Sequence, residues 1–267
     1  MPDLLAPDKD WRFFLSVYSL DDLWDVARAL HFLEILEQSI APPEFWGPGD
    51  VLVGKYDRRE VERYLRANQD PKESRPPLQL KRSTAPRYRA SLNVGNGIHP
   101  HSFHLTADLR HTAEELLQLF SLGDTLSSSI NLEFGTIDIN RDGQDPVTRM
   151  LRSGMTPNLD IYIELGFHTL FVRNYFGLRV VRLAGGPQAF TVDGAIVRTF
   201  ANGALAVDLH AAPWLADPVE LKAAQQQVLP QLRATTGLFY ITKSLDQLYP
   251  GSPGSSWQSP PGARWPK

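Results

Sequence analysis

The chain has 267 residues, of which 42% are hydrophobic and 21% charged, and this balance is typical of a globular protein long enough to bury a substantial core. Its net charge is −3 and its pI is about 6.2, so the chain as a whole lacks the positive charge of a nucleic-acid-binding protein. It contains no cysteine, which excludes disulfides, thiolate metal sites and a cysteine nucleophile.

The N-terminal sequence, MPDLLAPDKDWRFF, carries three aspartates and lacks the apolar core of a signal peptide. Apolar runs elsewhere are far shorter than the roughly 18 residues that a membrane-spanning helix requires. We therefore expect a cytoplasmic protein.

The first elements are a strand and two helices. Residues 11–19 alternate apolar and polar side chains, which predicts a strand. Ser19 with Asp22 resembles a capping box and predicts the start of a helix that ends near residue 39. VLVGKY (51–56) predicts a short strand, and Asp57 caps a second helix.

A hairpin and a third helix follow a polar, proline-rich connector. Residues 86–94 and 102–109 alternate on either side of a glycine-rich turn, which predicts two antiparallel strands with one wet face. We expect His104 on that wet face. Thr112 with Glu115 forms a capping box for the next helix.

The sequence pattern of the second half of the chain predicts mainly strands, with one long helix near its end. Asp217 is a strong helix start and Gly237 a helix stop. The expected strands cover residues 129–140, 158–165 and 178–183, a hairpin about Asp193-Gly194, and the segment after Asn202-Gly203.

This order of elements predicts an α+β fold, with a mixed, mainly antiparallel sheet packed with about four to five helices. We expect residues 1–250 to form a single α+β domain. A recurring strand–cap–helix outline suggests two similar halves, 10–125 and 126–250. Residues 251–267 form a tail rich in proline, glycine and serine.

GIHPHSFHL (97–105) concentrates three histidines, His99, His101 and His104. His99 and His101 would point the same way in an extended segment, so a metal-dependent hydrolase using both is an alternative function. A catalytic zinc site needs three converging protein ligands, and no third ligand stands at a recognisable spacing. A polar hairpin loop is the favoured interpretation, with no metal and no cofactor.

Two charged segments are candidate contact surfaces. Residues 133–164 hold six carboxylates against three arginines, and such a surface suits a basic partner. The candidate partner-binding residues are Asp138, Asp142, Asp145, Asp160 and Glu164. A basic run from Lys81 to Arg89 could touch phosphates, which leaves a nucleic-acid-binding scaffold as a third possibility.

Four sequence segments resemble those of the immunity protein 52 family: FFLSVYSLDDLWD, PPEFWGPGDVLVGKYDRREVERYL, LQLKRSTAPRYRASL and GLFYITKSLDQLYPG. The resemblance spans roughly residues 11–250. Members of that family accompany restriction-endonuclease-like toxins of polymorphic toxin systems, including nucleases delivered by type VI secretion, and they carry no catalytic residue set.

The resemblance implies a cytoplasmic immunity protein, not an enzyme. Such a protein binds a cognate nuclease toxin in the producing cell and blocks it. A DNase with a restriction-endonuclease-like fold is the expected partner, and neither direct nucleic-acid binding nor membrane association is expected.

Overall fold

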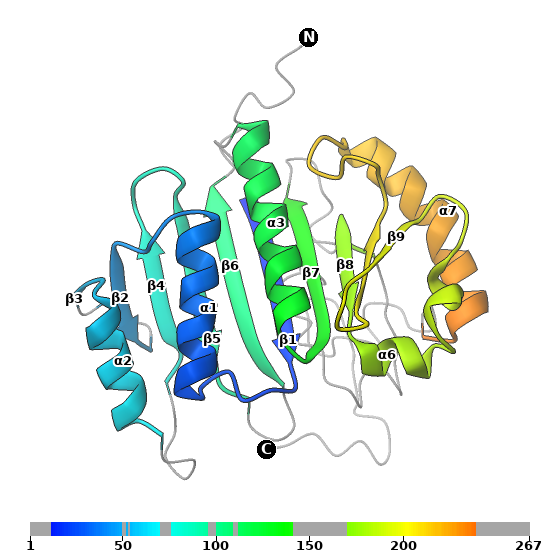
Figure 1. Cartoon of the computed structure of the whole chain (residues 1–267). Helices are drawn as coiled ribbons and strands as arrows, with labels where there is room; N and C mark the ends of the chain where they lie inside the picture. Colours follow the sequence, from blue (N-terminus) through cyan, green and yellow to red (C-terminus); the bar gives the residue numbers. More distant parts are fainter. Residues whose placement is uncertain are drawn as a thin grey trace, which may run out of the picture.

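The protein is an α+β fold built on one large antiparallel sheet (Figure 1). The structure, a computed structural model, describes residues 12–49, 52, 54–69, 76–95, 100–108, 112–140 and 170–238. The expected fold class is confirmed. The predicted strand 158–165 and the tail 251–267 lie outside the described residues.

Ten strands form the sheet, in the order β3-β2-β4-β5-β6-β1-β7-β8-β10-β9. Each neighbouring pair is antiparallel. The strands are β1 (Arg12–Ser19), β2 (Phe45–Pro48), β3 (Gly54–Lys55), β4 (Leu78–Arg82), β5 (Tyr88–Asn93), β6 (His101–Asp108), β7 (Leu132–Asn140), β8 (Arg173–Phe176), β9 (Ile196–Thr199) and β10 (Leu205–Asp208).

Four of the described helices begin where a side chain accepts hydrogen bonds from free backbone N–H groups. Asp57 caps α2, and the predicted capping box of Thr112 and Glu115 opens α3. Asp25, rather than Ser19 or Asp22, caps α1. The helices are α1 (Val26–Ser39), α2 (Arg58–Ala67), α3 (Ala113–Ser129), α6 (Leu178–Leu183) and α7 (Pro218–Thr236), with a 3-10 helix at Pro187–Phe190.

Helices cover opposite faces of the sheet at its two ends. The front face, which carries Phe13, Leu15 and Val17 of β1, packs against α1, α2 and α3 in the larger hydrophobic cluster (Figure 1). The back face packs against α6 and α7 at the β8–β10 end, where Phe176 and Val207 meet residues of both helices. Over β4, β5, β6 and β1, the back face carries mainly polar side chains.

Two predictions of the second half are wrong. Residues 178–183 form α6 rather than a strand, because Val180 and Val181 are buried together on one side of a helical turn. The turn at Asp193-Gly194 exists, but a 3-10 helix precedes it, and the hairpin is formed by β9 and β10. Within the described ranges, no helix has the length and apolar character needed to cross a membrane.

Candidate functional site

A row of polar side chains crosses six adjacent strands on the back face of the sheet. Because alternate residues of a strand point to the same face, the strand register places one polar residue of each strand at the same level. The row consists of Gln79, Ser91, His104, Ser16, Thr136 and Asn174, from β4, β5, β6, β1, β7 and β8.

His104 is half-buried near the middle of this row. Its Nδ1 atom lies 2.9 Å from Ser16 Oγ, and the edge of its ring meets Tyr18 at a centroid distance of 5.4 Å. Burial lowers the pKa of His104 to about 4, because the charged imidazolium loses its hydration. The face predicted for His104 is confirmed, but the residue is less exposed than expected.

The pair of Ser16 and His104 is poorly suited to nucleophilic catalysis. A general base works best when its pKa is near the working pH, and the pKa of His104 is far below neutrality. Burial also raises the pKa of Tyr18 well above its usual value, so this phenol stays protonated. The geometry therefore favours a structural hydrogen bond between β1 and β6.

We expect acidification to destabilise the protein through His104. The pKa of His104 in the folded state is below the usual 6.5, so the unfolded chain binds the proton first. Stability is therefore complete above about pH 6.5 and falls as the pH is lowered toward 4, by up to about 3 kcal/mol. Urea unfolding of His104→Gln at several pH values should show a flatter profile than the parent protein.

The matched control for that series is His31→Gln, because the His31 side chain is 54% exposed on α1. The exposed His31 contacts Glu34 at 4.0 Å, and exposed pairs contribute little to stability, so this substitution should change the pH profile much less than His104→Gln does. A profile of His104→Gln parallel to that of the parent protein would contradict the assignment.

A basic groove lies on the same face, toward the β4–β5 turn. Its volume is about 500 Å³, and it is lined by Lys81, Arg82, Ser83, Arg87, Tyr88, Arg89, Thr106 and Asp108. Lys81 and Arg89 face each other across β4 and β5, and Arg87 stands two residues before Arg89. Within the described part of the chain, Lys81, Arg87 and Arg89 form no ion pair.

The other groove arginine is held by protein groups. Arg82 donates hydrogen bonds to the carbonyls of Pro42 and Ala85, and its Nη1 lies 3.9 Å from Glu44 Oε1. Glu44 also accepts hydrogen bonds from Ser83 and Thr84. These contacts fix the turn that leads to Arg87, so the groove is preorganised.

Of the acidic residues predicted to bind a partner, Asp138 lies among the residues that the structure describes. Asp138 lies on β7 and is 4% exposed, so its side chain offers almost no surface for a partner to contact. Asp142, Asp145, Asp160 and Glu164 lie outside the described residues, and their role stays a prediction.

The histidine cluster shows no metal site among the residues that the structure describes, where no three histidines or carboxylates converge. His99 lies outside those residues. His101 begins β6, and its Nδ1 lies 3.4 Å from Asp22 Oδ1.

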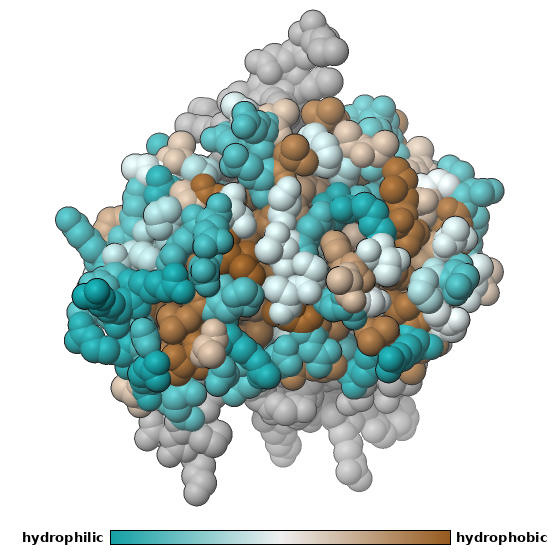
Figure 2. Space-filling model, in the orientation of Figure 1, coloured by the Kyte–Doolittle hydropathy of each residue, from teal (hydrophilic) through white to brown (hydrophobic). Residues whose placement is uncertain are grey.

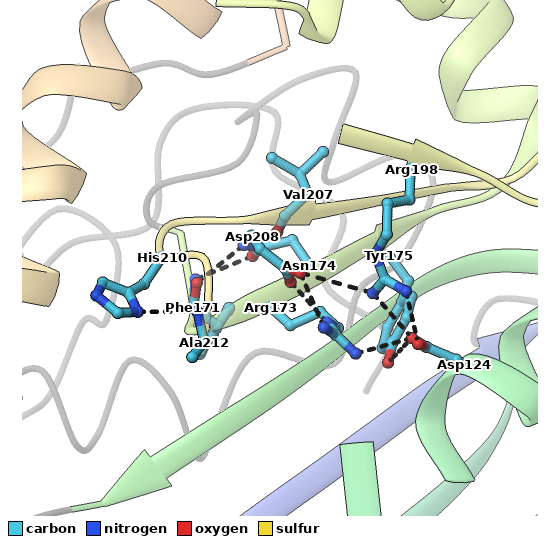
Figure 3. Close-up of polar contacts among 10 residues, drawn as sticks. All are labelled: Asp124, Phe171, Arg173, Asn174, Tyr175, Arg198, Val207, Asp208, His210 and Ala212. Carbon is cyan, nitrogen blue, oxygen red and sulfur yellow. Dashed lines mark hydrogen bonds and ion pairs between the residues drawn. The ribbon is translucent and has the colours of Figure 1, made fainter. Parts of the chain in front are cut away.

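A charge network built around the buried pair of Arg173 and Asp208 joins α3 to β8, β9 and β10 on the front face (Figure 3). Arg173 binds Asp208 through two hydrogen bonds of 2.6 and 2.8 Å, and its Nη1 donates to Asp124 at 3.0 Å. Tyr175 and Arg198 complete the network through Asp124, at 2.8 and 2.9 Å.

This network is balanced in charge, with two arginines and two carboxylates. Burial and the neighbouring Asp124 carboxylate raise the pKa of Tyr175 well above its usual value, so its hydroxyl remains a donor. Groups that are paired and saturated with hydrogen bonds stabilise strand positions rather than exchange protons with a substrate. The sequence alone did not reveal this network.

Among the described residues of the front face, no single large apolar surface is visible (Figure 2). Apolar side chains appear on it in separate patches among hydrophilic ones (Figure 2). The exposed large hydrophobic residues of the described part are likewise spread over different elements, as with Leu117 of α3, Leu183 of α6 and Ile196 of β9. The basic groove on the back face is therefore the more distinctive candidate binding surface.

Comparisons with known proteins leave the function open. No protein-family model and no curated protein matches the chain. Among solved structures, Pseudomonas aeruginosa T6SS protein PA0821 is similar over 82% of this chain and 72% of that chain, with 12% identity and a TM-score of 0.47. A likeness at this level carries no functional conclusion, and the resemblance to the immunity protein 52 family stays a prediction.

Proposed function

We propose that this chain is an immunity protein that binds and neutralises a cognate nuclease toxin in the cytoplasm of the producing cell. The proposal has two supports: the resemblance of four sequence segments to the immunity protein 52 family, and the character of the back face.

The observation that carries the proposal is the preorganised basic groove, whose three cations form no ion pair with any residue that the structure describes. Such a groove can recognise an oppositely charged surface, and complementary charge accelerates the encounter of two proteins. The nearby His104 is neutral at physiological pH and bonded to Ser16. The face thus suits recognition better than proton transfer.

Neutralisation requires a complex stable enough to prevent access to the toxin's active site. A specific interface of this kind buries about 1,600 Å² in total, which is more than the groove alone can provide. Asp142, Asp145, Asp160 and Glu164 are proposed to extend the contact toward the basic DNA-binding surface of the toxin.

Co-expression tests this function. We expect the protein encoded by the adjacent open reading frame to kill cells when it is expressed alone and to be harmless together with this chain. The two should also co-purify. A neighbour that is harmless alone, or that still kills in the presence of this chain, would refute the proposal.

A further inference from the structure

We propose that the basic groove of Lys81, Arg87 and Arg89 docks an extended, carboxylate-rich segment of the protein partner. This inference rests on the proposed function, because it assigns a role to the groove within the complex of this chain with its toxin.

The positions of the cations suit an extended peptide. Arg87 and Arg89 are separated by one residue along the chain and their side chains leave the same face, which places their Cα atoms about 7 Å apart. Lys81 stands opposite Arg89 on the neighbouring strand. Alternate side chains of an extended acidic peptide have the same spacing, so two successive carboxylates can each reach a guanidinium.

The cations are available for a ligand. Arg87 and Arg89 are exposed and Lys81 is half-buried, and within the described residues none of the three forms an ion pair. Carboxylates can bind arginine through two parallel hydrogen bonds. Because the neighbouring turn is fixed by Arg82 and Glu44, little ordering of the groove accompanies binding.

Other groups in the groove favour a peptide over nucleic acid. Single-stranded nucleic acid stacks its bases on exposed aromatic rings. Among the described residues that line this groove, Tyr88 is the one aromatic, and it is 2% exposed. Its hydroxyl donates to the carbonyl of Ala41. Asp108 on the groove wall can accept a hydrogen bond from a peptide N–H group, a donor that a phosphate backbone lacks.

The test compares a groove variant with a control of equal charge. Arg87→Glu/Arg89→Glu reverses two groove cations. Arg59→Glu/Lys222→Glu reverses two exposed cations on α2 and α7. Both double variants lower the net charge by the same amount, and thermal unfolding verifies that both fold.

The ligands are the purified product of the adjacent open reading frame, with its active site inactivated, and two labelled probes, hexaglutamate and hexathymidylate. Binding is measured at about 20 mM and about 300 mM salt. We expect the groove variant to bind both the toxin and hexaglutamate about tenfold more weakly at low salt. The control variant should bind like the parent protein, and high salt should reduce the difference.

The possible contrary outcomes are distinguishable. Equal affinity of all three proteins for the toxin overturns the inference and leaves the proposed function standing. Failure of the parent protein to bind the toxin overturns both. Tighter binding of hexathymidylate than of hexaglutamate, lost only in the groove variant, overturns the inference in favour of a nucleic-acid site.

Discussion

Replacing Arg173 by methionine is expected to lower the free energy of unfolding by about 3–5 kcal/mol. Arg173 and Asp208 each have side chains that are 5% exposed, and two hydrogen bonds join them. Methionine fills much of the same space but leaves the Asp208 carboxylate buried without its main partner. Chemical denaturation, followed by circular dichroism, measures the loss.

A double variant separates the ion pair from packing. Arg173→Met/Asp208→Leu removes both charges, and well-packed apolar residues often replace a buried pair with little loss of stability. We therefore expect the double variant to regain most of the stability lost in Arg173→Met. An Arg173→Met protein as stable as the parent would contradict the expected loss of stability. It would mean that Arg198, 3.5 Å from Asp208, is enough to compensate the charge of the Asp208 carboxylate.

Gly177→Ala is expected to destabilise the protein by about 3 kcal/mol or more. Gly177 joins β8 to α6, and its N–H donates to the Glu133 carbonyl at 3.0 Å. A Cβ atom at this position would overlap the backbone carbonyl of Leu132, and backbone cannot move aside as a flexible side chain can. Thermal and urea unfolding both measure the effect.

Gly54→Ala is the control for this prediction. A Cβ atom at Gly54 meets nothing within 4 Å, so its stability should stay within about 0.5 kcal/mol of the parent protein. If Gly177→Ala unfolds at the same urea concentration as Gly54→Ala, the close approach of the two backbone segments is not present in solution.

Local sequence signals predicted the starts of α2, α3 and α7 and the strands β1, β5 and β6, but they did not predict β2, β4 or the cap of α1. Capping hydrogen bonds join residues no more than three positions apart, as at Asp57, at Thr112 with Glu115, and at Asp217. A short stretch of sequence is therefore enough to predict them. Alternation in residues 102–109 likewise placed Phe103 and His104 on opposite faces. The same alternation could not reveal how deeply His104 is buried, because that depends on distant segments.

The errors come from interactions between distant parts of the chain. Residues 178–183 contain adjacent valines typical of a strand, yet they form α6 where Arg179 pairs with Glu133 at 2.9 Å. In the charge network, Asp124 contacts residues 49 and 74 positions away. The groove was visible only as a run of basic residues, since its shape depends on the pairing of β4, β5 and β6.

The place of β1 in the middle of the sheet has a consequence for synthesis. Arg12 is in register with Asp108 of β6 and with Asn140 of β7, so β1 leaves the ribosome long before either of these neighbours exists. Until then both of its edges remain open to pairing with other chains. The centre of the sheet can therefore fold only after much of the polypeptide has been synthesised. We expect nascent fragments that end before β6 to aggregate rapidly.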